Sequence, residues 1–155
     1  MKPDNPGVKV PPPLIYAAVF TIAILIQKRM PIDDSLFKKP PVHFISFFSL
    51  ILAIFFISRS LFQFSRTRNT VITVKAATSL QTTGIFHKTR NPMYVGLLMV
   101  YLGLTCMIGN WWNVILIPLL LLIIQEYVIK REEQYLSRKF GEDFIHYKQN
   151  VRRWL

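Results

Sequence analysis

The sequence predicts an all-α fold: an integral membrane bundle of four transmembrane helices with a C-terminal cytoplasmic helical extension. Two observations lead to this prediction. Of the 155 residues, 52% are hydrophobic and 17% are charged, and the apolar residues gather into four blocks with nearly all the charge between them. A helix needs about 20 mostly apolar residues to cross the core of a bilayer. The length suits a single domain, residues 1–155, and the blocking excludes a disordered chain.

The four expected spans differ in length. We expect them at residues 14–27, 42–58, 93–109 and 111–129. The first apolar block is the shortest, so this helix must tilt, borrow interfacial residues or thin the bilayer locally. It ends at Gln27-Lys28-Arg29 without a small-residue cleavage site, which favours a retained anchor over a cleaved signal peptide.

Basic residues predict the orientation of these spans. Because only Gly109-Asn110 connects the third and fourth spans, the two form an antiparallel hairpin. Most of the 19 basic residues fall in the N-terminus, in the middle loop 59–90 and in the tail from Lys130 onward. By the positive-inside rule, both termini and the middle loop are cytoplasmic, and the protein lies in an inner or plasma membrane.

Composition excludes several other classes of protein. The single cysteine, Cys106, rules out a disulfide framework and a cysteine-built metal site. The scattered His43, His87 and His146 argue against a histidine cluster, so we expect no metal. A net charge of +11 is typical of nucleic-acid binding, but these basic residues flank membrane spans, where anionic head groups account for them. We therefore expect no nucleic-acid partner.

The end of the middle loop, residues 78–96, is the first segment with chemical potential. Asn91-Pro92 is a strong helix start, because Asn serves as N-cap and Pro fits the first helical position. The exposed amides of such a helix start attract carboxylates and phosphates, although the same pair often does no more than start a helix. Gly96, in the first turns, leaves room for a close neighbour, either a ligand or another helix.

The second segment, residues 130–155, follows the fourth span. No helix breaker lies between Pro118 and Gly141, so we expect the fourth helix to continue about three turns beyond the hydrocarbon until Gly141 stops it. This extension carries the acidic pair Glu132-Glu133. The plain alternative is a solvated pair of acids beside two basic residues.

Hairpin geometry brings the two segments together. Two antiparallel helices of equal rise, folded at about residue 110, place Asn91 level with about residue 128. Glu132 and Glu133 then lie about one turn beyond the start of the third span, on the cytoplasmic side. The amides would bind a carboxylate, and a glutamate would bind hydroxyls or an ammonium. A zwitterionic nucleoside cofactor has all of these groups.

Residues of the two segments follow one pattern: Arg-His/Asn-Pro-x-Tyr-x-Gly, a pair of glutamates, Phe-Gly and a basic Val-x-Arg-like end. The matching residues are Arg90, Asn91, Pro92, Tyr94, Gly96, Glu132, Glu133, Leu136, Phe140, Gly141, Tyr147, Val151 and Arg152. This stretch, residues 78–155, resembles the isoprenylcysteine carboxyl methyltransferase family of integral membrane methyltransferases, and related phospholipid methyltransferases share the same plan.

The resemblance implies S-adenosylmethionine as methyl donor, held at the cytoplasmic membrane face with lateral access for a lipid-like acceptor. By position, the family's cofactor contacts would fall on Thr78, Ser79, Leu80, Gln81, Phe86, Asn91, Pro92, Met93, Tyr94, Glu132 and Glu133. Arg90 and Arg131 are candidates to position an anionic acceptor; otherwise they contact head groups.

Three residues depart from the family pattern or stay open. Phe86 stands where the family often has tyrosine, so a hydroxyl contact would be lost while packing is kept. Asn91 stands where histidine is frequent and cannot carry the charge of an imidazolium. Glu126, inside the fourth span, is either a functional acid, given the cost of its placement, or a paired or protonated acid near the inner interface.

The sequence therefore predicts S-adenosylmethionine-dependent methyl transfer to a membrane-embedded or lipid-like acceptor, such as the carboxylate of an isoprenylcysteine-like substrate. The partners would be the bilayer and this acceptor. Two other classes stay open. A membrane reductase of the sterol-reductase type has a related C-terminal plan and would use NADPH. A small membrane protein could also keep the fold and only bind lipid or a partner.

Overall fold

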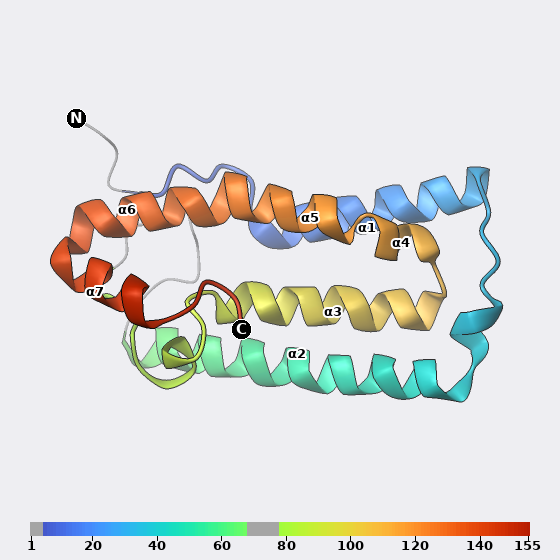
Figure 1. Cartoon of the computed structure of the whole chain (residues 1–155), viewed down its shortest axis with the longest axis horizontal. Coiled ribbons are helices and arrows are strands. Elements are labelled where there is room, and N and C mark those ends of the chain that lie inside the picture. The colour runs from blue at the N-terminus through green and yellow to red at the C-terminus, as the bar shows by residue number, and fades with distance from the viewer. Residues whose placement is uncertain (1–4, 68–77) are drawn as a thin grey trace.

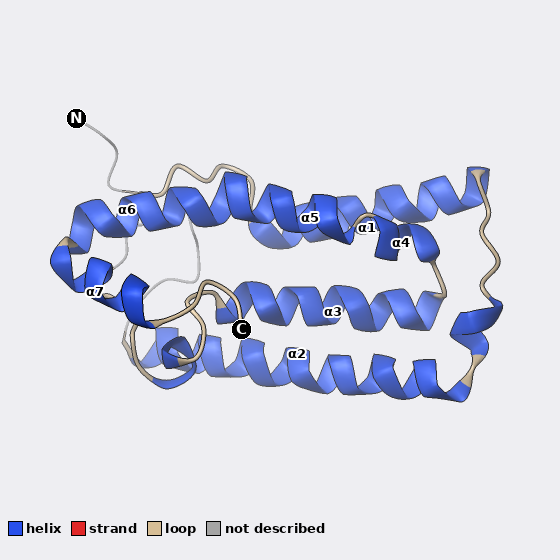
Figure 2. Cartoon of the chain, viewed as in Figure 1, coloured by secondary structure: helices blue, strands red, loops and turns tan. Residues whose placement is uncertain are grey.

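The computed structural model describes residues 5–67 and 78–155, and every regular element in these residues is helical (Figure 2). The elements are α1 (Pro12–Arg29), the 3-10 helix η1 (Ser35–Lys38), α2 (Pro40–Arg66), the 3-10 helix η2 (Gly84–His87), α3 (Pro92–Ile108), α4 (Trp111–Ile115), α5 (Ile117–Ile123), the π-helix η3 (Ile124–Ile129), α6 (Lys130–Phe140) and α7 (Glu142–Asn150). The all-α prediction is confirmed. Lys2 and part of the loop 59–90, used in the orientation argument, lie outside the described residues.

The helices form an elongated bundle with two distinct ends (Figure 1). α2 and α3 lie side by side and antiparallel, while α1 packs against α4, α5 and η3. α6 extends beyond the bundle, α7 folds back beneath it, and the C-terminus returns to the start of α3 (Figure 1). We call the end that holds α6, α7, the C-terminus and the start of α3 the site end. The opposite end, here the turn end, holds η1 and the turn between α3 and α4.

Small residues let α2 and α3 approach closely. Ser46 Oγ donates a hydrogen bond to the Gly103 carbonyl at 2.8 Å. A Cβ on Gly96 would lie 2.6 Å from Ile57 Cγ1 of α2, which no real Cβ tolerates without movement. The close neighbour expected beside Gly96 is therefore another helix. This kind of packing is common between helices in membranes.

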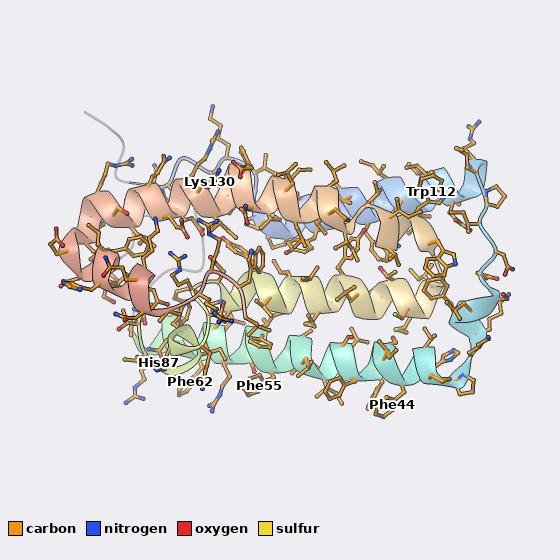
Figure 3. All side chains as sticks on the ribbon, viewed as in Figure 1. Phe44, Phe55, Phe62, His87, Trp112 and Lys130 are labelled. Carbon is orange, nitrogen blue, oxygen red and sulfur yellow. The ribbon has the colours of Figure 1, made fainter. Side chains whose placement is uncertain are left out.

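The expected turn is confirmed. Gly109 adopts a left-handed conformation with φ of 72°, which glycine reaches without steric cost. Asn110 then caps α4 by accepting a hydrogen bond from the Trp112 amide at 2.9 Å. The indole nitrogens of Trp111 and Trp112 donate to the carbonyls of Asp33 and Met30 (Figure 3 labels Trp112). These bonds tie the turn to the connection between α1 and α2.

The fourth apolar stretch is not one regular α-helix. Pro118 lacks the amide that would bond to the carbonyl four residues earlier, and the helix is interrupted at Leu116 between α4 and α5. A second irregularity, η3, follows at Ile124–Ile129. The extension itself is confirmed: α6 continues from η3 and ends before Gly141, which has a positive φ of 53°.

One helix in the described residues, α2, is long and apolar enough to cross a membrane by length and composition. α3 is apolar but shorter. The outer face of α2 exposes large apolar side chains, among them Phe44, Phe55 and Phe62 (Figure 3). Because the fourth stretch is interrupted and α1 is less apolar, the bundle of four transmembrane helices stays a prediction.

Candidate functional site

The start of α3 is built as the sequence predicts, but its Asn91 plays a different part. Asn91 occupies the N-cap position and Pro92 the first turn. The Asn91 side chain does not cap the helix; instead its Nδ2 donates to the Arg153 carbonyl at 2.9 Å. Thr89 Oγ1 donates to the same carbonyl and accepts from the Asn91 amide, both at 3.2 Å. The Arg153 carbonyl of the C-terminal tail thus binds the Asn91 side chain, which would otherwise be free to cap α3.

Tyr94 and Glu132 join the two segments directly. The Tyr94 hydroxyl, in the first turn of α3, donates to Glu132 Oε1 on α6 at 2.7 Å. The Tyr94 carbonyl accepts a hydrogen bond from the hydroxyl of Tyr16 on α1. This bond ties the backbone of Tyr94 to α1. The expectation that the helix start and the acidic pair lie together is confirmed by the contact between Tyr94 and Glu132.

Glu133 is the centre of an ion-pair network. Its carboxylate accepts from Arg153 Nε at 3.0 Å and from Nη2 at 2.8 Å, a bidentate pair. Arg90 Nη1 lies 3.0 Å from Glu133 Oε1, and Lys148 Nζ lies 4.0 Å from Oε2. The side chains of Arg90 and Glu133 are only 10% and 11% exposed. Glu133 of α6 therefore links the residues before α3, α7 and the C-terminal tail.

The two neighbouring acids have opposite electrostatic environments. Burial raises the pKa of Glu132 to about 7, although the hydrogen bond from Tyr94 works against this shift. Burial also raises the pKa of Glu133, but the hydrogen bond from Arg153 and the charge of Arg90 outweigh it and hold that pKa below its usual value. Glu132 is thus poised to exchange a proton near neutral pH, whereas Glu133 stays ionised.

The C-terminal tail, part of the expected segment 130–155, contacts the residues before α3. The Arg90 amide donates to the Arg152 carbonyl at 2.9 Å. The Tyr147 hydroxyl of α7 donates to the Phe86 carbonyl at 2.6 Å. Arg152 and Tyr147 belong to the recognised pattern, but Arg153 makes the ion pairs, and its position after α7 gives it no helical periodicity from which this role could be predicted.

Residues 78–86 lie near the end of α2. Gln63 Nε2 of α2 donates to Gln81 Oε1 at 3.2 Å and to Thr83 Oγ1 at 2.9 Å. Gln81 and Phe86 are buried, and the Phe86 ring lies 5.4 Å from that of Phe64. Of the remaining expected contacts, Pro92 is buried, Ser79, Leu80 and Met93 are half-buried, and Thr78 is exposed.

Two candidates lie apart from these contacts. Arg131 points to the N-terminal segment, where its Nη1 donates to the Gly7 carbonyl at 3.1 Å and its guanidinium stacks on Tyr127. Of the two interpretations of Glu126, the structure supports a paired acid: its side chain is 45% exposed and lies 2.6 Å from Lys130 Nζ. Across residues 5–67 and 78–155, no group of three potential metal ligands comes together.

Comparison with curated proteins finds two informative relatives. An uncharacterized protein of Haemophilus influenzae is 46% identical over 66 residues, which cover 41% of this chain and 100% of that protein. Protein-S-isoprenylcysteine O-methyltransferase of Schizosaccharomyces pombe is 35% identical over 72 residues, 46% of this chain but only 30% of the yeast protein. No solved structure matches significantly.

The family comparison covers a larger part of the chain. The phospholipid methyltransferase family profile matches residues 42–143. That range begins in α2 and runs through α3 and the whole of α6, so it includes both Tyr94 and Glu132. Since the match spans more than half of the sequence, the chain belongs to the phospholipid methyltransferase family.

Proposed function

We propose that this protein transfers a methyl group from S-adenosylmethionine to a lipid-like acceptor at the site end of the bundle. Family membership supports methyl transfer. The donor, the acceptor and the site residues are our proposal. The observation that carries it is the 2.7 Å hydrogen bond between Tyr94 and Glu132, which brings both recognised segments into one place.

The chemistry of the residues present suits such a donor. S-adenosylmethionine has an ammonium and ribose hydroxyls, which carboxylates bind, and an adenine ring, which aromatic side chains bind. In the described part of the chain Glu132 is bonded only by Tyr94, so it keeps acceptor capacity. Phe86 supplies a buried ring. Glu133, in contrast, is engaged by Arg90 and Arg153, so we assign it to holding the site together.

The protein's contribution is position and electrostatics. When bound, S-adenosylmethionine would supply an electrophilic methyl group on a sulfonium cation. Ionised Glu132 would stabilise positive charge at the site, and Tyr94 orients its carboxylate. A carboxylate acceptor needs no base, whereas an amine acceptor would need a group to take its proton, and Glu132, with a pKa of about 7, suits that task. The role of Arg90 and Arg131 in positioning an anionic acceptor stays a prediction.

We further propose that α1, α2, α3 and the stretch from α4 to η3 cross the bilayer, with the site end and both termini on the cytoplasmic side. The tryptophans at the turn end suit a membrane interface there, and the basic residues at the site end support the orientation. The domain would then comprise residues 1–155, with the cofactor-binding segments 78–96 and 130–155 at the membrane surface.

The test is isothermal titration of S-adenosylhomocysteine into the detergent-solubilised full chain. We expect saturable binding that weakens about tenfold or more in Glu132→Gln and less in Tyr94→Phe, because hydrogen bonds to a charged group contribute about 1.5–3 kcal/mol. Glu126→Gln, which removes an exposed acid from the same helical stretch, is the matched control and should bind as the wild type does.

Unchanged affinity in both Glu132→Gln and Tyr94→Phe would discard the site. Binding of NADPH in place of S-adenosylhomocysteine would replace the proposal with a reductase. If the folded protein binds neither compound, a lipid- or partner-binding role takes its place.

A further inference from the structure

A groove of about 500 Å³ lies between α6, α7 and the C-terminal tail. Its α6 wall consists of residues spaced three and four apart, from Lys130 through Glu133 to Arg138, which places them on one face of the helix. Lys148 of α7 and Arg153 of the tail form the opposite wall. Glu132, which contacts Tyr94, does not line the groove. The groove shares Glu133 and Arg153 with the network that holds the site together, but it does not include Tyr94 or Glu132.

The groove is lined by more basic side chains than its one acid can neutralise. Its single acid, Glu133, already receives Arg153 and Arg90. Lys130 pairs with Glu126 at 2.6 Å. Arg138 has no ion-pair partner among residues 5–67 and 78–155, and Lys148 reaches Glu133 only at 4.0 Å. The side chains of Arg138 and Lys148 therefore line the groove without a close carboxylate partner.

Such an arrangement favours an anion with several oxygens. Like charges held around one groove repel each other, and a bound anion relieves this repulsion. Arginine and lysine provide several donors from different directions, and phosphate accepts bonds from all of them. Ser137 and Gln134 add neutral polar groups to the α6 wall.

The position of the groove along the chain favours a membrane lipid as the source of the phosphate. Lys130 is the first residue after the apolar helix η3, so the groove begins where the proposed membrane-spanning stretch ends. From Lys130 to Arg138 the helix rises about 12 Å, while the head-group layer on each side of a bilayer is about 5–8 Å thick. The lower part of the groove then lies at head-group depth.

We propose that this groove binds the phosphate of an anionic membrane lipid at a site separate from Tyr94 and Glu132. The inference rests on the proposed membrane orientation, but not on the identity of the methyl donor. Arg153 already contacts Glu133 of α6 and Asn91 at the start of α3. An anionic lipid bound between α6 and the tail would join these two elements further. The lipid would therefore stabilise the site end.

The test compares thermal unfolding of the detergent-solubilised full chain with added phosphatidylglycerol, phosphatidylcholine or inorganic phosphate. We expect phosphatidylglycerol alone to raise the melting temperature. In the double variant Arg138→Gln/Lys148→Gln, half-saturation should need about tenfold more lipid, because two charge-assisted contacts are lost. The matched control, Arg29→Gln/Lys39→Gln, removes the same charge at the turn end and should respond as the wild type does.

Three outcomes would overturn the proposal. They are equal weakening in the control, an unchanged response in the double variant, and full stabilisation by inorganic phosphate or phosphatidylcholine. S-adenosylhomocysteine titration of the single variant Arg138→Gln separates this proposal from the cofactor site: Arg138 takes no part in the ion pairs of Glu133, so this variant should keep its cofactor affinity, and loss of that affinity would contradict two separate sites. Each melting curve also shows whether the variant is folded.

Discussion

The two ends of the bundle use charge in different ways. At the turn end, Asp34 and Lys38 form a 2.8 Å pair one helical turn apart, with side chains 42% and 72% exposed. At the site end, Glu133 and Arg90 lie 43 residues apart in sequence and are about nine tenths buried. The first pair is a local surface contact. The second joins distant segments and is largely shielded from water.

This difference predicts where substitutions matter. An exposed ion pair contributes little because water and salt screen it. A buried charge that loses its partner is costly, since neither water nor another group replaces the partner. The turn end is closed by a glycine turn and tryptophan hydrogen bonds, whereas the site end depends on a network of charges.

The largest effect is expected for Glu133→Gln. The substitution leaves buried Arg90 without its ion-pair partner, so we expect the free energy of unfolding to fall by about 3–5 kcal/mol. Thermal unfolding in detergent measures this loss. Asp34→Asn at the turn end is the matched control and should change stability by less than about 1 kcal/mol. Losses of equal size would remove the distinction between the two ends.

The next effect concerns pH and distinguishes Glu132 from its neighbour. A carboxyl whose pKa rises on folding, here from 4.5 to about 7, binds its proton more tightly in the folded protein. The free energy of unfolding of the wild type should therefore fall as pH rises from about 4.5 to about 7, by at most about 3 kcal/mol. Glu132→Gln should gain stability relative to the wild type from pH 5 to pH 8. A constant difference between the two melting curves across this range would show that Glu132 titrates normally.

The smallest expected effect comes from two glycine substitutions in α3, one near the site end and one nearer the turn end. Gly96→Ala forces α3 away from Ile57 of α2 and should cost about 1–3 kcal/mol. Because Gly96 lies near the start of α3, we also expect weaker binding of S-adenosylhomocysteine. Gly103→Ala meets Leu50 at 2.7 Å, nearer the turn end, and should cost similar stability while leaving binding unchanged. Equal loss of binding in both variants would contradict the assignment of the site to one end.

Local signals in the sequence were enough to predict much of the frame. Asn91-Pro92 does begin α3, Gly109-Asn110 does make the turn, and Gly141 does end α6. Each of these depends on backbone preferences of one or two residues, which act regardless of tertiary structure. The hairpin then placed the acidic pair beside the helix start by simple counting of helical rise.

Other features depend on tertiary contacts that the sequence does not display. Ile124, Val128 and Ile129 of η3 are all fully buried, and a wider π-helical turn lets residues four and five apart face the same side. A uniformly apolar stretch gives no sign of this irregularity. Likewise, the roles of Thr89 and Arg153 come from the return of the tail to α3, a contact across more than 60 residues.

Photolabelling with radioactive S-adenosylmethionine, followed by peptide mapping, tests most directly whether the site end binds the donor. The full chain would be irradiated in detergent, with excess S-adenosylhomocysteine as competitor in a parallel sample. We expect competitor-sensitive label in peptides from residues 78–96 or 130–155. Label confined to peptides of the turn end, or label that the competitor does not displace, would contradict a methyl-donor site formed by Tyr94 and Glu132.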